Sequence, residues 1–350
     1  MKTIDPSAPI LVTGGTGFIA GWIIRYLIED GRRVHATVRD PNRREKVAHL
    51  EALADKGPGT LKLFRADLLD ADAFDDPMQG CELVLHTASP FTLGPFKDVE
   101  AELIRPALEG TRNVLEAANR TASVRRVVLT SSVAAVYGDA ADLREVPAGV
   151  FTEDHWNLTS SERHQPYSFS KTLAEKEAWS IQSQQDLWDL VTVNPSMVLG
   201  PSLTSASASG SIGVMKQLGD GTARLGVPDI RFGVVDVREV AQAHLQAGFT
   251  PAAEGRHILS AAEMSLLEIA AVLRRRFGDA YPFPRRVSPK FVVWLLAPAL
   301  GLTRAFVARN VGHPVRFDHT RSVEALGIEY RPVEESIVEL FQQMIDDGLV

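Results

Sequence analysis

Short apolar runs rich in β-branched residues alternate with longer helical patterns through the first half of the chain, and this alternation restricts the fold most. The runs are Ile10–Thr13, Arg33–Val38, Leu61–Phe64, Leu83–His86, Val127–Thr130 and Leu190–Asn194. Continuous apolar strands separated by helices are typical of a parallel sheet with helices on both faces. We therefore predict an α/β fold built on a doubly wound parallel sheet.

The pattern changes after residue 194, which predicts a second, smaller lobe. Small residues dominate the segment PSMVLGPSLTSASASGS, and helical patterns follow around residues 265–277, 289–311 and 332–345. Residues 231–249 are interpreted as a strand and a helix that return to the sheet. We predict a dinucleotide-binding domain of residues 1–195 plus 228–262, and a mostly helical C-terminal substrate lobe of residues 196–227 plus 263–350.

Composition argues against several classes of partner for the chain as a whole. The 350 residues carry a net charge of −7, so the chain as a whole offers no positive field to nucleic acid or to an anionic membrane, and any basic site must be local. Cys81 is the only cysteine, which excludes an internal disulfide and a cysteine-rich metal site. We expect a cytoplasmic protein with no nucleic-acid and no membrane partner.

The N-terminus and the most apolar late segment bear on export and on a membrane span. The N-terminal residues MKTIDPSAP contain no apolar stretch of signal-peptide length. The most apolar late segment, residues 291–302, is interrupted by Pro298 and is shorter than the ~20 residues that cross a bilayer. We interpret residues 291–302 as a buried or lid-forming helix.

A glycine-rich loop, TGGTGFIA at residues 13–20, separates the first strand from the first helical pattern. Glycines let the backbone turn tightly and approach a pyrophosphate, and the following helix N-terminus offers unpaired N–H groups. The spacing G-x-x-G-x-x-A departs from the usual G-x-G-x-x-G, but alanine still allows close packing of helix on strand. An ordinary glycine turn is the alternative. The loop predicts a Rossmann-type site in which NAD(P) is bound by Thr13, Gly14, Thr16, Gly17, Phe18 and Ile19.

The end of the second strand carries Arg39 followed by Asp40. Enzymes that use NAD place an acidic residue here on the ribose 2′-hydroxyl, whereas arginine can bind a 2′-phosphate with two hydrogen bonds. Lys46 adds a second positive charge, Asp40 argues the other way, and a solvated surface arginine is the alternative. We predict NADP(H) as the cofactor. Asp67 and Leu68, after the third strand, are predicted to flank the adenine or else to cap a helix.

Tyr167 and Lys171 lie four residues apart in YSFSK, at the start of a helix-favouring run. They share one helix face, so the ammonium can lie near the phenol and is expected to lower the Tyr167 pKa from about 10, making it a workable proton donor to a carbonyl oxygen. Thr130, Ser131 and Ser132 end the fifth strand, where ligands of parallel sheets bind and where a serine can polarise a carbonyl. A surface Tyr–Lys pair and a strand-end turn are the alternatives.

Seven motifs follow one another along the chain: TGGTGFIA, ATVRD with Lys46, HTASPF, TSSVAAVYG, YSFSK, NPSMVLGP and VDVREVAQAHL. Together they resemble the dihydroflavonol-reductase-like branch of the extended short-chain dehydrogenases, and look closest to its microbial methylglyoxal and ketone reductases. The likeness runs from residue 11 to about residue 260. It implies that Tyr167 is the general acid, that Lys171 modulates it and anchors the ribose, and that Ser132 orients the carbonyl.

The resemblance implies further contacts. To the cofactor site it adds Thr87, Ala88, Ser89, Thr130, Pro195, Met197 and Val198. At the substrate it places, besides Ser132, the side chains of Phe91, Tyr137, His164 and Met197, for which core filling is the alternative. These four side chains suggest an apolar or aromatic pocket and substrate. Plant flavonoid reductases carry an asparagine where this chain has Tyr137, which puts flavonoid specificity in doubt. Asn113 is either a water-mediated support of the lysine or a plain surface residue. No second ligand accompanies His164 at metal-binding spacing, so we predict no metal.

The predicted activity is reduction of an aldehyde, ketone or α-dicarbonyl by NADPH, with hydride transfer to carbon and a proton from Tyr167. An NAD-dependent nucleotide-sugar epimerase or dehydratase shares the fold and the Tyr–Lys pair, but Arg39 and the apolar substrate positions argue against it. A non-catalytic dinucleotide sensor has no need of an intact serine, tyrosine and lysine set. The resemblance leaves monomer and homodimer both open.

Overall fold

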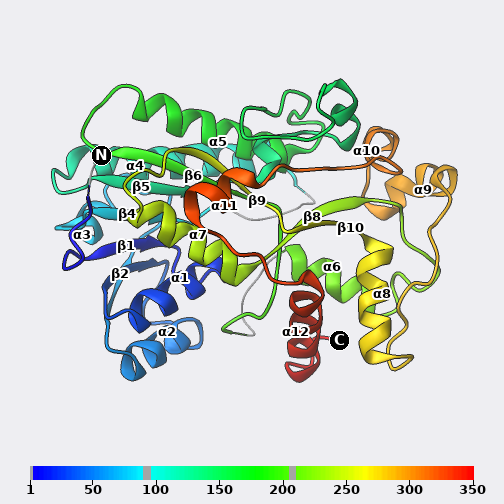
Figure 1. Cartoon of the computed structure of the whole chain (residues 1–350), viewed down its shortest axis with the longest axis horizontal. Coiled ribbons are helices and arrows are strands. Elements are labelled where there is room, and N and C mark those ends of the chain that lie inside the picture. The colour runs from blue at the N-terminus through cyan, green and yellow to red at the C-terminus, as the bar shows by residue number, and fades with distance from the viewer. Residues whose placement is uncertain (1–2, 90–95, 205–209) are drawn as a thin grey trace.

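A seven-stranded parallel sheet forms the centre of the computed structural model, which describes residues 3–89, 96–204 and 210–350 (Figure 1). The strand order is β3-β2-β1-β4-β5-β6-β9, and neighbouring strands pair in parallel. The strands are β1 Ile10–Thr13, β2 Arg33–Val38, β3 Thr60–Arg65, β4 Leu83–His86, β5 Arg126–Thr130, β6 Asp189–Pro195 and β9 Gly255–Leu259. The predicted doubly wound sheet is confirmed. The bounds of β1, β2 and β4 are as predicted, and β3, β5 and β6 extend by one residue at one or both ends.

Helices cover both faces of this sheet, because alternate side chains of each strand point to opposite faces. On β1, Ile10 and Val12 pack in one apolar core and Leu11 packs in the other. The first core is closed by helices α1 Phe18–Glu29, α2 Arg44–Lys56, α7 Val237–Phe249 and α11 Thr320–Leu326. The opposite face is covered by α3 Asp75–Met78, α4 Arg105–Arg120, which continues the π-helical turn η1 Glu100–Ile104, and α5 Pro166–Gln182.

A second, three-stranded sheet belongs to the smaller lobe. Its strands β7 Met197–Leu199, β8 Arg231–Asp236 and β10 Ala262–Ser265 lie in the order β10-β8-β7. Helices α6 Gly210–Gly219, α8 Leu266–Phe277 and α12 Val333–Asp346 pack around a separate core with it. The prediction that residues 231–249 return to the main sheet is half wrong: α7 packs on that sheet, but β8 pairs with β7 and β10, and β9 takes the edge beside β6.

Residues 289–311, expected as one helical stretch, form three short helices at one end of the molecule (Figure 1). These are α9 Lys290–Leu296, the 3₁₀ turn η4 Ala297–Leu300 and α10 Arg304–Asn310. Pro298 has no backbone N–H to donate, and Gly301 adopts a left-handed φ of 69°, so the helix ends there. The expectation of burial is wrong for one face of α9, since Phe291 is 73% exposed and Leu295 is 62% exposed.

Two more 3₁₀ turns, η2 Val133–Ala135 and η3 Ala140–Glu145, follow β5 and lead from the sheet to the candidate site. The division of the chain into residues 1–195 plus 228–262 and 196–227 plus 263–350 stays a prediction. Among the residues that the structure describes, none of the helices combines the length and apolar character needed to span a membrane.

Candidate active site

The turn from β1 into α1 has the shape that a dinucleotide pyrophosphate requires. Gly14 adopts a left-handed φ of 69°, and a Cβ there would lie 3.0 Å from the Cα of Ala88, so only glycine fits without strain. Gly17 caps the N-terminus of α1 and makes no side-chain hydrogen bond to the backbone N–H groups of the first turn, which Phe18 and Ile19 begin. The partial positive charge of this helix end therefore remains for an anion, and the turn fits a pyrophosphate.

Thr13 joins the ends of β1 and β4 beside this turn. Its Oγ1 lies 2.8 Å from His86 Nδ1 and accepts a hydrogen bond of 3.0 Å from the backbone N–H of Ala88. The hydroxyl of Thr87 donates to the Thr13 carbonyl at 2.5 Å. These bonds bring the HTAS segment against Gly14, so two of the predicted cofactor segments meet.

The residues predicted to bind the 2′-phosphate, Arg39 and Lys46, follow the end of β2. Arg39 is exposed and Lys46 is half-buried, and within residues 3–89, 96–204 and 210–350 neither forms an ion pair. The neighbouring arginines differ, since Arg43 pairs with Glu45 at 2.6 Å and Arg44 is likewise paired. The Asp40 side chain accepts a hydrogen bond from its own turn, at the backbone of Asn42. Arg39 and Lys46 are therefore available to a phosphate.

The loop after β3 is held to helix α4. Asp67 Oδ1 accepts the backbone N–H of Leu69 at 3.0 Å, so it closes a turn rather than capping a helix. The amide of Asn113 donates to the Leu68 carbonyl at 2.8 Å. Asn113 thus positions the segment predicted to flank the adenine.

Helix α5 and strand β5 bring the three predicted catalytic side chains together. Tyr167 and Lys171 lie one turn apart on α5, with Lys171 Nζ 5.9 Å from the centroid of the Tyr167 ring. Ser132 follows β5, caps η2, and hydrogen bonds to the Tyr167 phenol. Lys171 also donates to Ser89 Oγ at 2.9 Å, which links the pair to the cofactor turn.

Two further cofactor predictions fall around this group. Ser132 Oγ lies 3.4 Å from the carbonyl oxygen of Pro195, at the end of β6, from which Met197 and Val198 continue as β7. Thr130 Oγ1 is 2.6 Å from His244 Nε2 and so is held by α7. The carboxyl ends of β1, β4, β5 and β6 therefore meet at one edge of the sheet, where such sheets bind ligands.

The pKa of Tyr167 in the Tyr–Lys pair differs from the expectation. Removal from water raises the Tyr167 pKa to about 12, and the hydrogen bond to Ser132 only partly opposes this. Burial lowers the Lys171 pKa to about 8, while the Glu175 carboxylate acts to raise it. The predicted lowering of the Tyr167 pKa is therefore wrong for this structure, because loss of solvent is the largest effect on the phenol. The phenol keeps its proton at neutral pH, which is the form that a proton donor needs.

Residues 10–259 match the NAD dependent epimerase/dehydratase family. The chain belongs to this family. It is 36% identical to cinnamoyl-CoA reductase CAD2 of Medicago truncatula, over 96% of this chain and 95% of that protein. It is 39% identical to an anthocyanidin reductase of Vitis vinifera, over 76% of this chain and 80% of the relative. The yeast methylglyoxal/isovaleraldehyde reductase Gre2, solved with NADPH, has a TM-score of 0.77 and 27% identity and covers 98% of this chain and 100% of its own. The predicted place in the dihydroflavonol-reductase-like branch of the extended short-chain dehydrogenases is confirmed.

The side chains predicted to face substrate in this family member have varied surroundings. Tyr137 packs between Phe151 and Phe317, with ring centroids 5.1 and 5.4 Å away. Burial and nearby carboxylates raise its pKa to about 12. Met197 is partly buried and packs against the core of the smaller lobe. Phe91 lies outside the described residues. The assignment of these side chains to substrate stays a prediction.

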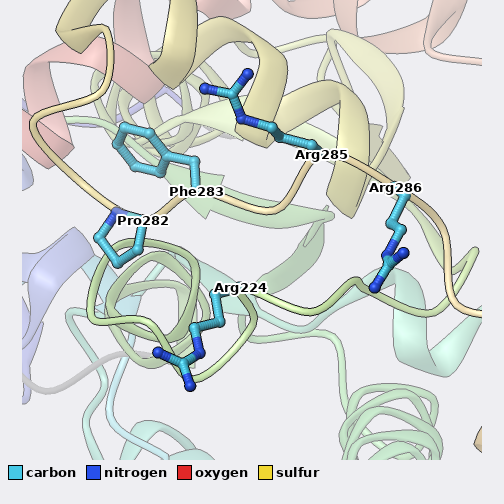
Figure 2. Close-up of a pocket in the computed structure, with 5 residues that line it drawn as sticks. All are labelled: Arg224, Pro282, Phe283, Arg285 and Arg286. Carbon is cyan, nitrogen blue, oxygen red and sulfur yellow. The ribbon is translucent and has the colours of Figure 1, made fainter.

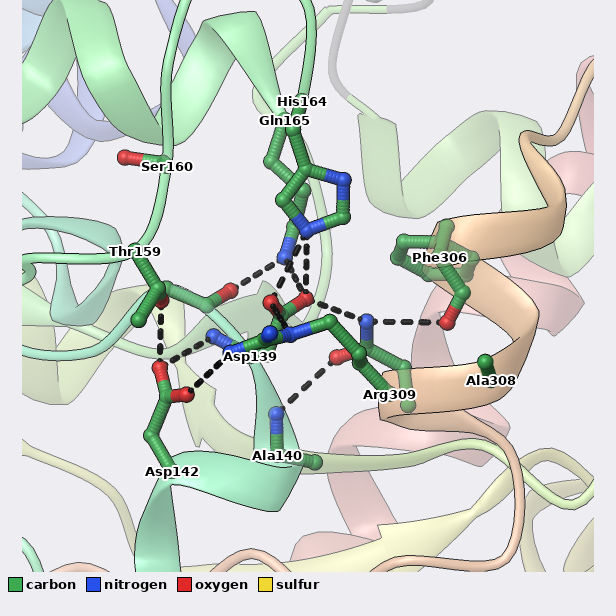
Figure 3. Close-up of polar contacts among 12 residues, drawn as sticks. Asp139, Ala140, Asp142, Thr159, Ser160, His164, Gln165, Phe306, Ala308 and Arg309 are labelled. Carbon is green, nitrogen blue, oxygen red and sulfur yellow. Dashed lines mark hydrogen bonds and ion pairs between the residues drawn. The ribbon is translucent and has the colours of Figure 1, made fainter.

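His164, the fourth of these residues, belongs to a polar cluster around the fully buried Asp139 (Figure 3). His164 Nε2 lies 2.8 Å from Asp139 Oδ2, and the Gln165 amide donates to Oδ1 at 2.7 Å. Arg309 and Asn310 of α10 donate to the same carboxylate at 2.5 and 2.7 Å. The cluster joins the loop after β5, the residues before α5 and helix α10. Its members are up to 171 residues apart, so no short spacing in the sequence could reveal it.

Glu175 is a second residue that sequence reasoning missed. It is fully buried and accepts hydrogen bonds from Arg256 Nε at 2.6 Å, Ser131 Oγ at 2.5 Å and Asn194 Nδ2 at 2.8 Å. It lies one helical turn beyond Lys171 on α5, and that i to i+4 spacing was the available signal. Glu175 fixes the serine turn after β5 relative to the lysine. Ser131 bonds to Glu175, whereas Ser132 bonds to the Tyr167 phenol.

Proposed function

We propose that this protein reduces an aldehyde, ketone or α-dicarbonyl compound to the alcohol, with NADPH as hydride donor and Tyr167 as proton donor. The observation that carries the proposal is the meeting of Ser132, Tyr167 and Lys171 at the carboxyl ends of the parallel strands. Lys171 bonds to Ser89, whose neighbour Ala88 lies against Gly14. The reacting groups are thereby adjacent to the dinucleotide turn.

The cofactor is NADP(H), and the protein is an oxidoreductase of the short-chain dehydrogenase type. The unpaired charges of Arg39 and Lys46 at the end of β2 suit a 2′-phosphate. Among the relatives, the curated proteins from Medicago and Vitis are named as reductases, and the yeast reductase was solved with NADPH. These likenesses support reduction rather than the sugar epimerisation that the family name also covers.

The chemistry that bound NADPH supplies is hydride donation to the carbonyl carbon. The remaining work falls to the side chains. Ser132 donates a hydrogen bond that orients the carbonyl oxygen, and Tyr167 gives its proton to that oxygen as negative charge develops there. The ammonium of Lys171 stabilises the phenolate that is left behind. Tyr137 and Met197 favour an apolar or aromatic substrate. The site is compatible with both a monomer and a homodimer.

The proposal is tested by following oxidation of NADPH, and separately of NADH, with a panel of aliphatic aldehydes, aryl ketones and α-diketones. We expect consumption of NADPH well above that of NADH, with formation of the alcohol. The Tyr167→Phe variant is expected to lose about 10²- to 10⁴-fold in kcat, whereas Tyr281→Phe, in the aromatic cluster of the smaller lobe, serves as the matched control.

Other outcomes would redirect the assignment. Tightly held NAD with no consumption of added NADPH would indicate a nucleotide-sugar epimerase or dehydratase. NADPH binding without turnover of any carbonyl would indicate a dinucleotide sensor. Turnover that survives in Tyr167→Phe would remove the tyrosine from the proposed mechanism.

A further inference from the structure

One face of the α9–η4 segment exposes large apolar side chains next to one another in sequence. We call Phe291, Trp294, Leu295, Leu296 and Leu300 the α9 apolar face; their exposed fractions are 73, 42, 62, 48 and 57%. The other exposed large apolar residues of the described chain are scattered singly, apart from Val287 nearby. Single exposed apolar residues are ordinary, but a contiguous group of this kind marks an interaction surface.

The exposure does not come from a badly packed helix. The opposite side of α9–η4 is buried, with Val293 and Ala297 packed against Ile230 and Val307. The Lys290 ammonium fixes the start of α9 by donating to the carbonyl of Ala308 at 2.9 Å, near the end of α10. The segment is therefore an amphipathic element held by one side, with its apolar face exposed to solvent. It lies at one end of the molecule (Figure 1).

The charge around this face has the opposite sign to that of the whole protein. Residues 280–317 contain six lysines and arginines and no aspartate or glutamate, although the full chain has a net charge of −7. These basic residues are Arg285, Arg286, Lys290, Arg304, Arg309 and Arg316. This segment is therefore a local basic site within an acidic protein, and its positive charge favours an anionic partner.

Some of these basic side chains form ion pairs with described residues, and others do not. Arg309 pairs with Asp139, and Arg285 pairs with Asp279. No described residue forms an ion pair with Arg286 or Arg304, and the Arg304 guanidinium lies over the Trp294 ring, 4.4 Å from its centroid.

Arg224, Arg285 and Arg286 also line an open hollow of about 400 Å³ beside α8 (Figure 2). Their guanidinium groups point apart rather than toward one centre (Figure 2). This arrangement does not form a pocket for one small anion, but it adds to a positively charged surface of broad extent.

We propose that the α9 apolar face docks on an anionic lipid membrane surface. A helix with Trp, Phe and Leu on one face and Arg or Lys around it has the composition of elements that lie in the membrane interface plane, with the apolar side chains inserted among the headgroups. Anionic headgroups match the surrounding positive charge, which extends the contact beyond the inserted side chains.

A second copy of the chain fits this face less well. In a twofold dimer the same surface meets itself, so Arg286 and Arg304 of both copies would approach like charges. An anionic lipid surface removes that repulsion. The docking is peripheral, since no described helix can span a bilayer.

The test uses the full chain and vesicle co-flotation, with vesicles of phosphatidylcholine alone and of phosphatidylcholine mixed with phosphatidylserine. We expect binding to the mixed vesicles that weakens as salt rises and that is at least about tenfold weaker with neutral vesicles. The double variant Phe291→Ser, Leu295→Ser is expected to reduce binding at least about tenfold, because both apolar contacts are lost. Leu158→Ser, Leu187→Ser is the matched control, since these leucines are also exposed, at 82 and 54%, but lie outside the segment.

Unchanged circular dichroism and thermal midpoints in both double variants show that the fold is retained. Equal binding to neutral and anionic vesicles, or no flotation with either, would overturn the proposal. So would equal loss in the two double variants. A concentration-dependent dimer, measured by light scattering and abolished by Phe291→Ser, Leu295→Ser, would assign the face to a second copy instead.

Discussion

The ammonium of Lys171 is buried, and burial disfavours its charged form. Burial lowers its pKa to about 8, below the ordinary value of 10.5 for a lysine, so the unfolded chain binds more protons between these values. Folding stability from this group therefore rises as pH increases from about 8 toward about 10.5. A bound anionic dinucleotide has the opposite preference, because it stabilises the charged form of the lysine.

We accordingly expect the affinity for NADPH to fall as pH rises through about 8, where Lys171 loses its proton. The dissociation constant, measured by titration of nicotinamide fluorescence from about pH 6.5 to about pH 9.5, should increase across that range. The inflection should disappear in Lys171→Met and persist in Tyr167→Phe. A profile that is flat in the wild type, or identical in Lys171→Met, would contradict this role of the lysine.

We propose that the preference for NADPH depends on Arg39. Replacing it with alanine removes a charge-assisted hydrogen bond worth about 1.5–3 kcal/mol, so kcat/KM for NADPH should fall roughly 10- to 100-fold while that for NADH changes little. Arg43→Ala is the control, because Arg43 is already paired with Glu45. Equal losses for the two dinucleotides would show that Arg39 does not contact the 2′-phosphate.

The sequence allowed us to predict which side chains of the candidate site meet, but not the environment in which they lie. Tyr167 and Lys171 meet because four residues make one helical turn, and Ser132 reaches them because parallel strands end at a common edge. The direction of the Tyr167 pKa shift depends on how much water the folded chain excludes, which spacing does not reveal. Glu175 and Asp139 act through partners that are distant in sequence.

At the scale of elements, the buried Asp139 ties α10 to the start of α5, the helix that carries Tyr167 and Lys171. Gln165, two residues before Tyr167, is the only non-glycine residue of the described chain with a positive φ, at 53°. Its amide bonds to Gly138 and Asp139 hold it in this strained conformation. Asp139 is thus a positioning residue for the tyrosine.

The variant Asp139→Ala should lower the free energy of unfolding by about 3 kcal/mol, because it leaves several donors without their acceptor. It should also lower kcat at saturating NADPH while the dissociation constant of NADPH stays nearly unchanged, since the cofactor turn is not part of the cluster. Denaturant titration and steady-state kinetics measure the two effects. Asp279→Ala removes an exposed partner of Arg285 and should cost less than about 1 kcal/mol. Similar results for the two variants would deny the positioning role.

Elements with a strong pattern were predicted well, and those whose place depends on tertiary contacts were not. β1, β2 and β4 are short apolar runs with clear ends, and their bounds match. β8 has the same buried appearance as a strand of the main sheet, so its sequence does not show which sheet it joins. Likewise, the apolar residues of α9 predict burial by composition, but only one side of the helix finds a core.

At the scale of the whole molecule, β8 and α7 belong to both lobes. Val234 packs in the core of the smaller lobe, while the next residue, Val235, packs in a core of the main sheet. Arg238 of α7 bonds to Asp236 and to Glu339 of α12 at 2.8 and 2.5 Å, which fastens the C-terminal helix to the dinucleotide-binding side. Loss of either core would therefore expose apolar surface of the other, and we expect the lobes to unfold in one transition.

Hydrogen exchange with and without NADPH measures this coupling. At about 100 times its dissociation constant, a ligand that binds only the folded state stabilises it by about 2.7 kcal/mol. Amides that exchange through global unfolding should then slow by roughly 100-fold, in α12 around the fully buried Phe341 as much as in α1 beside the cofactor turn. Slowing confined to α1 would mean that the smaller lobe opens independently, and the shared strand would not transmit stability between the lobes. Equal slowing in both helices would mean that the two lobes unfold together, as expected if one strand carries residues of both cores.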